Sequence, residues 1–214
     1  YSSRPGAENI TENEEEKRVM PALEAILKRF PETLISIDTF RSGLAAKAID
    51  LGACMINDIS AGNLDKDMFR TVASKQVPYV AMHMPGTPVT MQKMTNYDDL
   101  VTDLVYFFSK KISELRELHI NDIIIDVGFG FGKTLEQNYT LLRKLEVFHM
   151  LGVPILTGIS RKSMVYKIIG SEPEQALNGT TVANTIALLK GSNILRVHDV
   201  KEAVEAIKIT RAYV

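Results

Sequence analysis

The sequence predicts a parallel α/β barrel in which strands and helices alternate along the chain. Six short apolar runs occur in it, and each run except the last leads through a helix-like segment to the next. The runs are Leu34–Asp38, Cys54–Asn57, Tyr79–His83, Ile123–Asp126, Ile155–Ser160 and Ile194–His198. They are continuously apolar, as expected of parallel strands covered by helices. Each ends in a residue that can do chemistry, and parallel barrels handle substrates at the carboxyl ends of their strands.

Helical periodicity fills the segments between the runs. The expected helices span Glu14–Phe30, Ser42–Leu51, Asp65–Lys75, Asp98–Leu118, Leu135–Leu151 and Thr180–Lys190, and a last one opens at Asp199. Gly52, Gly152 and Gly191 follow three of these helices, where glycine provides the left-handed conformation that ends a helix. Pro21 must lie in the first turn of its helix or kink it.

The sequence predicts one domain that spans residues 1–214. Its 214 residues are enough for a well-buried core, and no linker-like or low-complexity stretch divides them. A barrel of eight units usually needs about 250 residues. The chain holds about six units and begins in a loop-like segment without methionine. The simplest account is an N-terminally truncated barrel without its first two strands. A doubly wound open sheet is the competing topology, although no glycine-rich dinucleotide turn follows a first strand.

Composition argues against two broad classes of partner. The formal net charge is -1, with 45% hydrophobic and 24% charged residues, so nothing favours a general nucleic-acid or membrane surface. No apolar run approaches the length that crosses a bilayer. The single cysteine, Cys54, lies in an apolar run, where we expect a buried structural thiol. A chain with one cysteine cannot form an internal disulfide, which suits a cytoplasmic protein.

Carboxylate and amide side chains end three of the predicted strands. Asp38 and Asp126 end two of them, and Asn57 ends a third. A carboxylate in such a place is costly to bury without a partner. Together these side chains suit a ligand with a donor-rich edge, such as an aminopyrimidinone ring. A single aspartate at a strand end would more commonly be a helix cap or an ion-pair partner.

A glycine-rich loop follows Asp126 directly. Its sequence, Gly128-Phe-Gly-Phe-Gly-Lys133, resembles a phosphate-binding loop only superficially, because Gly128 and Gly132 are one residue too close for that motif. The glycines are better explained as a sharp backbone turn beside a ligand. Phe131 then either presents its ring to the ligand or packs on the barrel rim.

Cationic side chains end the last two strands. Ser160-Arg161-Lys162-Ser163 closes one, and Arg196 with His198 closes the other. The loops after the last two strands of a barrel commonly bind phosphate, and arginine matches phosphate oxygens with a two-pronged donor. Adjacent cations can also be an ordinary solvated face. The one cysteine and four scattered histidines show no zinc-ligand spacing, and no Gly-x-Ser-x-Gly elbow is present.

Seven motifs in one order closely resemble the dihydropteroate synthase family of the folate pathway. They are S-R-P-G-A, S-I-D-T, I-N-D-I-S, M-H-M-x-G-T-P-x-T-M-Q, D-V-G-F-G-F-G-K, S-R-K-S and R-V-H-D-V. The resemblance covers essentially the whole chain. It implies a TIM-type (β/α)8 barrel that joins para-aminobenzoate to a dihydropterin diphosphate and releases diphosphate with the help of Mg²⁺.

The resemblance also implies residue roles. As catalytic residues it implies Asp126, Lys162, Arg196 and His198. As substrate-binding residues it implies Ser3, Arg4, Pro5, Asp38, Asn57, Met82, Phe131 and Ser163. By the resemblance, the implied pterin pocket is lined by Asp38, Asn57, Asp126 and Lys162, with Met82 and Phe131 as its apolar contacts. Arg196 and His198 would hold the diphosphate, and Ser163, Phe131 and the Ser3-Arg4-Pro5 segment the aminobenzoate.

The sequence departs from the family at its beginning and at two motif positions. Val127 stands where the family usually has proline, and Ser3 where it usually has threonine. The family's first two strands, and the loop whose asparagine binds the metal, have no counterpart, so no metal ligand is assigned here. We therefore expect this chain to be poorly active or inactive by itself and to self-associate through exposed sheet edges. The family also implies a homodimer that uses helices late in the chain.

Two other functions remain open at this point. A corrinoid-type methyltransferase domain uses a similar pterin pocket, but it is not expected to carry S-R-K-S together with S-R-P-G-A. A non-catalytic pterin-binding paralogue would keep the pocket without the chemistry. The presence of Lys162, Arg196 and His198 argues against it.

Overall fold

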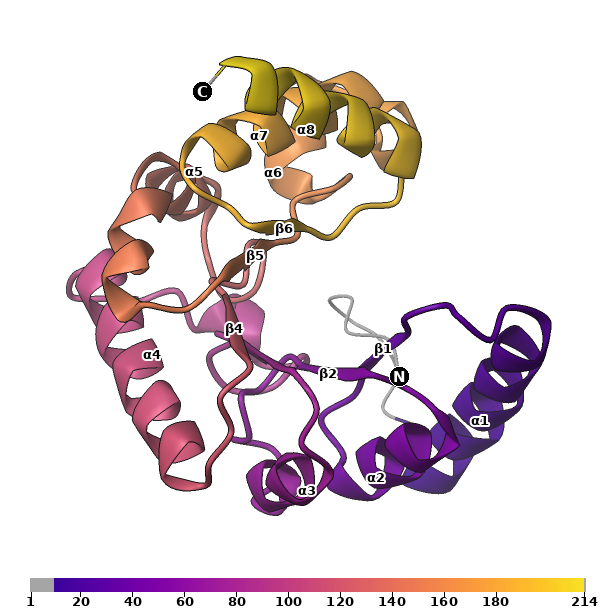
Figure 1. Cartoon of the computed structure of the whole chain (residues 1–214). Helices are drawn as coiled ribbons and strands as arrows, with labels where there is room; N and C mark the ends of the chain where they lie inside the picture. The colour runs from indigo at the N-terminus through magenta and orange to yellow at the C-terminus, as the bar shows by residue number, and fades with distance from the viewer. Residues whose placement is uncertain (1–9, 214) are drawn as a thin grey trace.

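Six parallel strands form one sheet in chain order in this computed structural model, which describes residues 10–213. The strands are β1 (Ser36–Asp38), β2 (Met55–Asp58), β3 (Tyr79–Met82), β4 (Ile123–Asp126), β5 (Ile155–Thr157) and β6 (Ile194–Leu195). Figure 1 shows the sheet curling around, with its helices on the outer side. The order β1-β2-β3-β4-β5-β6, without reversals, is that of consecutive βα units and confirms the barrel-type architecture.

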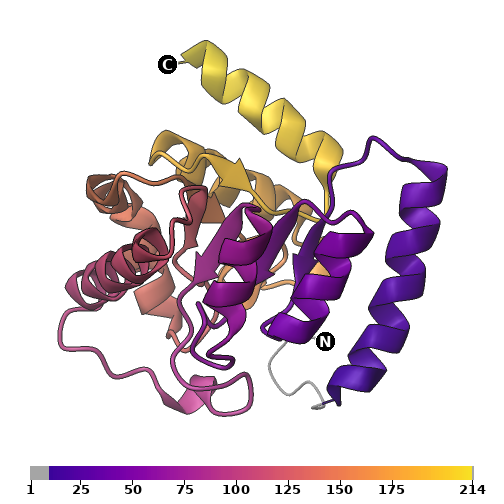
Figure 2. The ribbon, with the colours of Figure 1, turned by 60° about the horizontal axis from the view of Figure 1, so that its bottom comes forward.

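The helices follow the strands as the periodicity predicts. The α-helices are α1 (Glu12–Arg29), α2 (Ser42–Leu51), α3 (Met68–Lys75), α4 (Leu100–Glu117), α5 (Leu135–Arg143), α6 (Ser163–Tyr166), α7 (Leu177–Leu189) and α8 (Val200–Tyr213). Three 3₁₀ helices accompany them: η1 (Met91–Lys93), η2 (Leu145–Leu151) and η3 (Pro173–Gln175). Turned by 60° in Figure 2, the ribbon shows α1 and α8 at the outside of the molecule.

Several boundaries differ from the sequence prediction. The single helix expected over Leu135–Leu151 is divided into α5 and η2, and α7 begins at Leu177 instead of Thr180. Pro21 lies in the interior of α1, not in its first turn. His83, Ser160 and the segment after Leu195 follow their strands instead of belonging to them.

Two layers of apolar side chains lie on the two faces of the sheet. The larger layer packs between strands and helices and includes Ile56, Tyr79 and Ile125, together with Phe108 of α4. The smaller layer is on the inner face and consists of Val80, Ile124 and Leu156, with Met55 and Ile194 against them. Because side chains alternate along a strand, the residues two positions beyond this inner layer also face inward, at the strand ends.

The outer faces of some elements are less buried than their periodicity suggested. Ile26 of α1 and Phe30 directly after it are exposed, as are Val200 and Val204 of α8. Cys54, expected to be buried, is half-buried just before β2, and its Sγ lies 3.4 Å from the carbonyl oxygen of Ile35. Within residues 10–213, no helix combines the length and the apolar character that a membrane crossing requires.

Candidate active site

The ends of β1 and β2 contribute one carboxylate and one amide to the candidate site. The register places Asp38 beside Asn57, and the Asn57 amide donates a hydrogen bond of 2.6 Å to Asp38 Oδ1. Asn57 is buried, whereas Asp38 keeps part of its surface exposed. Asn57 Oδ1 is buried and has no hydrogen-bond partner in the described part of the chain. A buried acceptor without a partner is costly, so this end of the sheet favours a ligand that brings a donor.

Asp126 lies buried at the end of β4. Its Oδ1 accepts a hydrogen bond of 2.8 Å from the backbone N–H of Gly128. Burial raises the pKa of Asp126 above its ordinary value, and Lys162, Gly128, Lys133 and Arg196 oppose that rise. The carboxylate is therefore surrounded by groups that favour its charged form, in the place where the sequence predicted a ring-binding acid.

Lys162 reaches the same point from the loop after β5. Its Nζ donates a hydrogen bond of 2.7 Å to the carbonyl oxygen of Phe129 and lies 4.7 Å from the centroid of the Phe131 ring. Burial lowers the pKa of Lys162 to about 8, although the nearby Asp126 raises it. Lys162 is therefore held between the Phe129 carbonyl, the Phe131 ring and the Asp126 carboxylate.

Gly158 leaves the space in which these groups meet. A Cβ placed on it would lie 3.9 Å from Asp126 Oδ2, 3.9 Å from Lys162 Nζ and 3.9 Å from Cβ of Arg196. Any larger residue would project between the acid and the two cations. The sequence analysis did not single out Gly158, and its only signal was a small residue directly after the last residue of β5.

Arg196 and His198 follow β6, and their side chains contact different partners. Arg196 Nη2 contacts the carboxylate of Asp38, so it reaches across from the last strand to the first. His198 lies against Ser160, whose Oγ is 2.9 Å from Nδ1 and 3.2 Å from the backbone nitrogen of His198. Both side chains are exposed. Because an exposed ion pair contributes little free energy, Arg196 can leave Asp38 for an anion at small cost.

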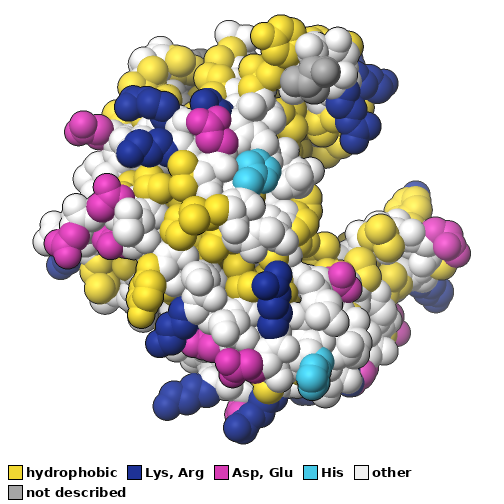
Figure 3. All heavy atoms as spheres, turned by 60° about the vertical axis from the view of Figure 1, so that its left-hand side comes forward, with side chains coloured by type: hydrophobic (Ala, Val, Ile, Leu, Met, Phe, Trp, Pro, Cys, Tyr) yellow, Lys and Arg dark blue, Asp and Glu magenta, His cyan; other side chains and the backbone are white. Residues whose placement is uncertain are grey.

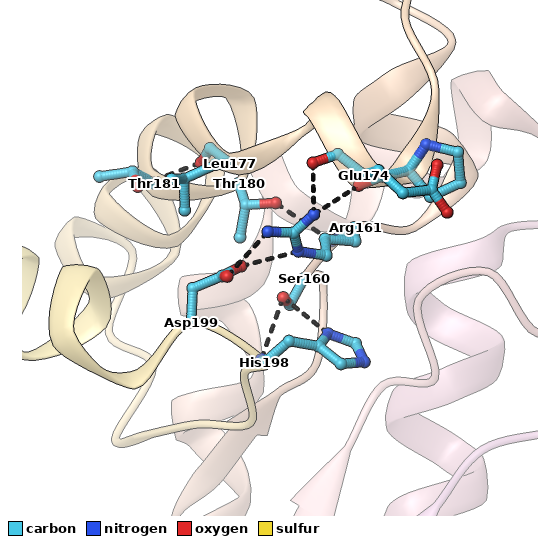
Figure 4. A network of polar contacts seen from close by, with 9 residues as sticks. Ser160, Arg161, Glu174, Leu177, Thr180, Thr181, His198 and Asp199 are labelled. Carbon is cyan, nitrogen blue, oxygen red and sulfur yellow. Dashed lines mark hydrogen bonds and ion pairs between the residues drawn. The ribbon is translucent and has the colours of Figure 1, made fainter.

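Arg161 ties the loop after β5 to the loop after β6. Its guanidinium donates to both carboxylate oxygens of Asp199, at 2.8 and 2.9 Å, and to the backbone carbonyls of Pro173 and Glu174. Figure 4 shows this network beside the Ser160–His198 contact. Asp199 directly precedes α8, and its two carboxylate oxygens accept from Arg161. The network holds His198 and Lys162 in neighbouring loops.

An apolar cluster covers one side of the strand ends. It combines Met82 and Phe131, which the sequence analysis named, with residues that it missed. The missed members are Ile59, Met84 and Met91, with Phe40 and Leu64 packed against them. They lie beyond the strand ends, in loops or, for Met91, at the start of the short helix η1, where no periodicity marks them. The cluster offers a flat apolar ring a place beside Asp126 and Lys162.

The structure thus brings Asp38, Asn57, Asp126, Lys162 and Arg196 to one end of the sheet, with Met82 and Phe131 at its apolar side. Ser163 begins α6, directly after Lys162. Ser3, Arg4 and Pro5 fall outside the described residues.

The outer surface of the molecule differs in character from the candidate site. On the face shown in Figure 3, basic and acidic side chains are interspersed among apolar ones.

Comparison with known proteins gives one consistent result. A family model described as pterin binding enzyme matches residues 1–198. The dihydropteroate synthase of Escherichia coli K12 is 39% identical over 213 residues, which is 99% of this chain and 75% of that protein.

Solved structures agree with that match. The Yersinia pestis dihydropteroate synthase with a sulfonamide drug complex superposes with a TM-score of 0.93 at 40% identity, over 99% of this chain and 77% of that chain. The Xanthomonas albilineans dihydropteroate synthase with 4-aminobenzoic acid gives a TM-score of 0.92 at 37% identity, over 99% and 76% of the two chains.

Proposed function

Because the chain belongs to the pterin-binding enzyme family and matches its dihydropteroate synthases, we propose that it joins a dihydropterin diphosphate to para-aminobenzoate. One observation carries the assignment to a site: the acid Asp126 and the cations Lys162 and Arg196 converge around the space above Gly158. An acid for the ring and cations for the diphosphate are what this pair of substrates requires.

The pterin ring is proposed to lie between Asp126 and the apolar cluster. Its amino and ring N–H groups donate to the Asp126 carboxylate, and charge-assisted bonds of this kind are the strong ones. Asn57 Oδ1, which is otherwise unpartnered in the described chain, accepts a further donor. Phe131 and Met82 contact the ring face. Lys162, which lies over the Phe131 ring, donates to a ring acceptor.

The diphosphate is proposed to lie toward Arg196 and His198. The aminobenzoate amine is a weak nucleophile, so early departure of the diphosphate favours the reaction. The C–O bond between the pterin methylene and the diphosphate breaks, and the leaving oxygen keeps the electron pair. The amine nitrogen then forms the new C–N bond and loses one proton. Arg196 and His198 stabilise the charge that develops on the leaving group, and Asp126 stabilises the pterin cation.

The aminobenzoate is proposed to approach from the side of α6. Ser163 begins that helix, and Lys162 and Phe131 lie beside it. The family resemblance adds Ser3, Arg4 and Pro5 to this part of the site. The Ser3 hydroxyl, the Arg4 guanidinium and the Pro5 ring would then complete a pocket for a carboxylate-bearing ring.

Magnesium stays a prediction from the resemblance. Mg²⁺ prefers oxygen ligands and commonly binds through one or two carboxylates together with substrate phosphates. Within residues 10–213, no three acidic, histidine or cysteine side chains gather as a metal site. Asp38, the more exposed carboxylate of the site, already holds Asn57 and Arg196. The described residues therefore do not fit the ion by themselves, and no step of the reaction is assigned to it.

We expect this chain to release diphosphate only when both the dihydropterin diphosphate and para-aminobenzoate are present. A coupled diphosphate assay, run in parallel on the Escherichia coli relative, measures this. Methyl transfer from methyltetrahydrofolate would support the corrinoid-type alternative instead. If this chain binds the pterin but does not turn over, under conditions in which the Escherichia coli relative does, the result would support a non-catalytic pterin-binding paralogue.

A homodimer is proposed to form through α7 and α8. Val182, Ile186 and Leu189 of α7 and Ile209 of α8 are large apolar side chains that remain exposed. Replacing Val182 with glutamate should convert a dimer to a monomer, as measured by size-exclusion chromatography with light scattering. Leu34→Glu is the matched control, because Leu34 is also exposed but precedes β1. Association that persists in Val182→Glu would favour the sheet edges as the contact.

We also infer a single domain over residues 1–214 and a cytoplasmic location. The first rests on the continuous order of the six strands, and the second on the single cysteine. Limited proteolysis that leaves one stable core, and cell fractionation, test the two inferences.

A further inference from the structure

The loops after β3 and β4 are locked together. The β3 loop is residues 83–97, and the β4 loop is residues 127–134. Gln92 donates a hydrogen bond of 3.2 Å to the carbonyl oxygen of Gly130, and Tyr97 donates one of 2.9 Å to that of Gly132. Gly128 has a φ of 71°, and a Cβ on it would collide with the carbonyl oxygen of His83. The two backbones therefore approach too closely for any side chain at position 128.

Lys133 lies in the middle of this contact. It is buried, with 5% of its surface exposed. Its Nζ lies 2.9 Å from the carbonyl oxygen of Phe131 and 3.1 Å from that of Gly128, both in the β4 loop. It also lies 3.1 Å from Nδ1 of His83, in the β3 loop. Lys133 points into the protein between the loops, so the superficial likeness of its motif to a phosphate-binding loop does not describe its role.

The contacts fix which groups donate. An ammonium has three donors and no acceptor, so Lys133 donates to the two β4-loop carbonyls and to His83, whose Nδ1 at 3.1 Å is nearer than its carbonyl oxygen at 3.5 Å. Nδ1 can accept only if the imidazole is neutral and its proton is on Nε2. Burial and the Lys133 charge both lower the pKa of His83 well below its ordinary value, which agrees with a neutral ring. Burial lowers the pKa of Lys133 to about 7, and Asp126 opposes that change.

The same loop carries two residues of the candidate site. Gly128, whose carbonyl Lys133 holds, donates its N–H to Asp126 Oδ1. Phe131, whose carbonyl Lys133 also holds, places its ring beneath Lys162. A shift of the β4 loop would therefore move the Asp126 carboxylate and the Phe131 ring together.

We propose that Lys133 is a positioning residue, which pins the β4 loop to His83 and thereby places Asp126 and Phe131 for the pterin ring. For its ligand this proposal rests on the proposed function. No part of it requires Lys133 to touch the substrate. The expected signature is a coupled loss of order in both loops and of pterin affinity, without an effect on distant helices.

The first test is hydrogen–deuterium exchange on Lys133→Met without ligand. Methionine keeps a similar length but has no donor. Exchange should rise at least tenfold in peptides that cover residues 83–97 and 127–138, and it should not change in α2. Lys111→Met is the control, because Lys111 is a mostly buried lysine of α4 that packs over the Phe69 ring. Unchanged exchange in both loops of a folded Lys133→Met protein overturns the proposal.

The second test is calorimetric titration with a 6-substituted pterin diphosphate analogue across pH. Lys133→Met should bind at least tenfold more weakly. Asp126 is faced by Lys162, Lys133 and Arg196, so removing one cation raises the pKa of Asp126. The pH below which affinity falls, as Asp126 becomes protonated, should therefore be higher than in the original chain. Loosened packing alone would not produce this shift. Lys133→Arg keeps the charge and should leave that pH unchanged. Affinity within twofold of the original chain contradicts the proposal.

His83 provides a second route if Lys133→Met does not fold. His83→Asn keeps an acceptor near the position of Nδ1, and His83→Leu removes it. His83→Leu should reproduce both effects, whereas His83→Asn should resemble the original chain, and equal behaviour of the two variants overturns the proposal. If the original chain binds no pterin analogue, the proposed function fails, and the exchange experiment still decides whether Lys133 pins the loops.

Discussion

Replacing Asp126 with asparagine is expected to weaken binding of a 6-substituted pterin diphosphate analogue about a hundredfold. Hydrogen bonds to a charged group are worth about 1.5–3 kcal/mol each, and the amide also presents a donor where the ligand presents donors. The carboxylate is buried at the end of β4, so water cannot replace the lost acceptor. Its neighbours Lys162 and Arg196 would also lose their negative partner.

Asp58→Asn is the matched control for this experiment. Asp58 is also a buried aspartate at a strand end, but its carboxylate accepts from Tyr79, Ser60 and Gly62 on the helix-covered side of the sheet. It should lower thermal stability without changing pterin affinity. Calorimetric titration well below the melting temperature of both variants compares them. Equal losses of affinity in the two proteins would mean that Asp126 acts only through the fold, and undiminished affinity in Asp126→Asn would remove it from the site.

Replacing Arg196 with alanine is expected to reduce the rate of diphosphate release about 10²–10³-fold. Removing one donor that stabilises developing negative charge typically costs that much. Arg196, which follows the last strand, contacts Asp38 at the end of the first strand. Binding of the diphosphate would draw Arg196 away and leave Asp38 for the pterin side, so one ligand would complete both halves of the site.

Comparing two ligands distinguishes a loss of diphosphate binding from a general disturbance of the fold. Arg196→Ala should lose affinity for a pterin diphosphate analogue but keep it for a hydroxymethyl pterin without phosphate. This difference can be measured by calorimetry even if turnover by the chain is slow. Arg70→Ala is the control, since Arg70 is an exposed arginine on α3. An equal loss of affinity for both ligands would place Arg196 at the pterin ring. Unchanged affinity for both would contradict its assignment to the diphosphate.

The strands and their chemistry-bearing ends could be predicted from the sequence because they depend on local pattern. Continuous apolar runs bounded by helices are typical of a parallel sheet, and alternation along each strand carries Asn57 and Asp126 to the inner face. The amphipathic pattern of α4 was confirmed in the same way, with Leu104, Phe108 and Leu115 buried. These inferences need only neighbours along the chain.

Loop residues could not be predicted in that way. The sequence analysis read Lys133 only as the end of a superficial phosphate motif, and it missed Gly158, Ile59 and Met91. Each of these owes its place to a segment far away in the sequence: Lys133 to His83, Gly158 to Asp126 and Arg196. No local spacing encodes such pairs, because they form only when separate loops pack against each other.

The sequence by itself therefore determined the alternating strand order, the apolar layers and the identity of the polar groups at the strand ends. Only the tertiary structure decided how those groups pair. Arg196 meets Asp38 although 158 positions separate them, because curling of the sheet brings the last strand toward the first. Likewise, Arg196 still donates its backbone N–H to Thr157 of β5, but His198 lies beyond that last ladder bond and contacts Ser160, a partner that strand alternation does not specify.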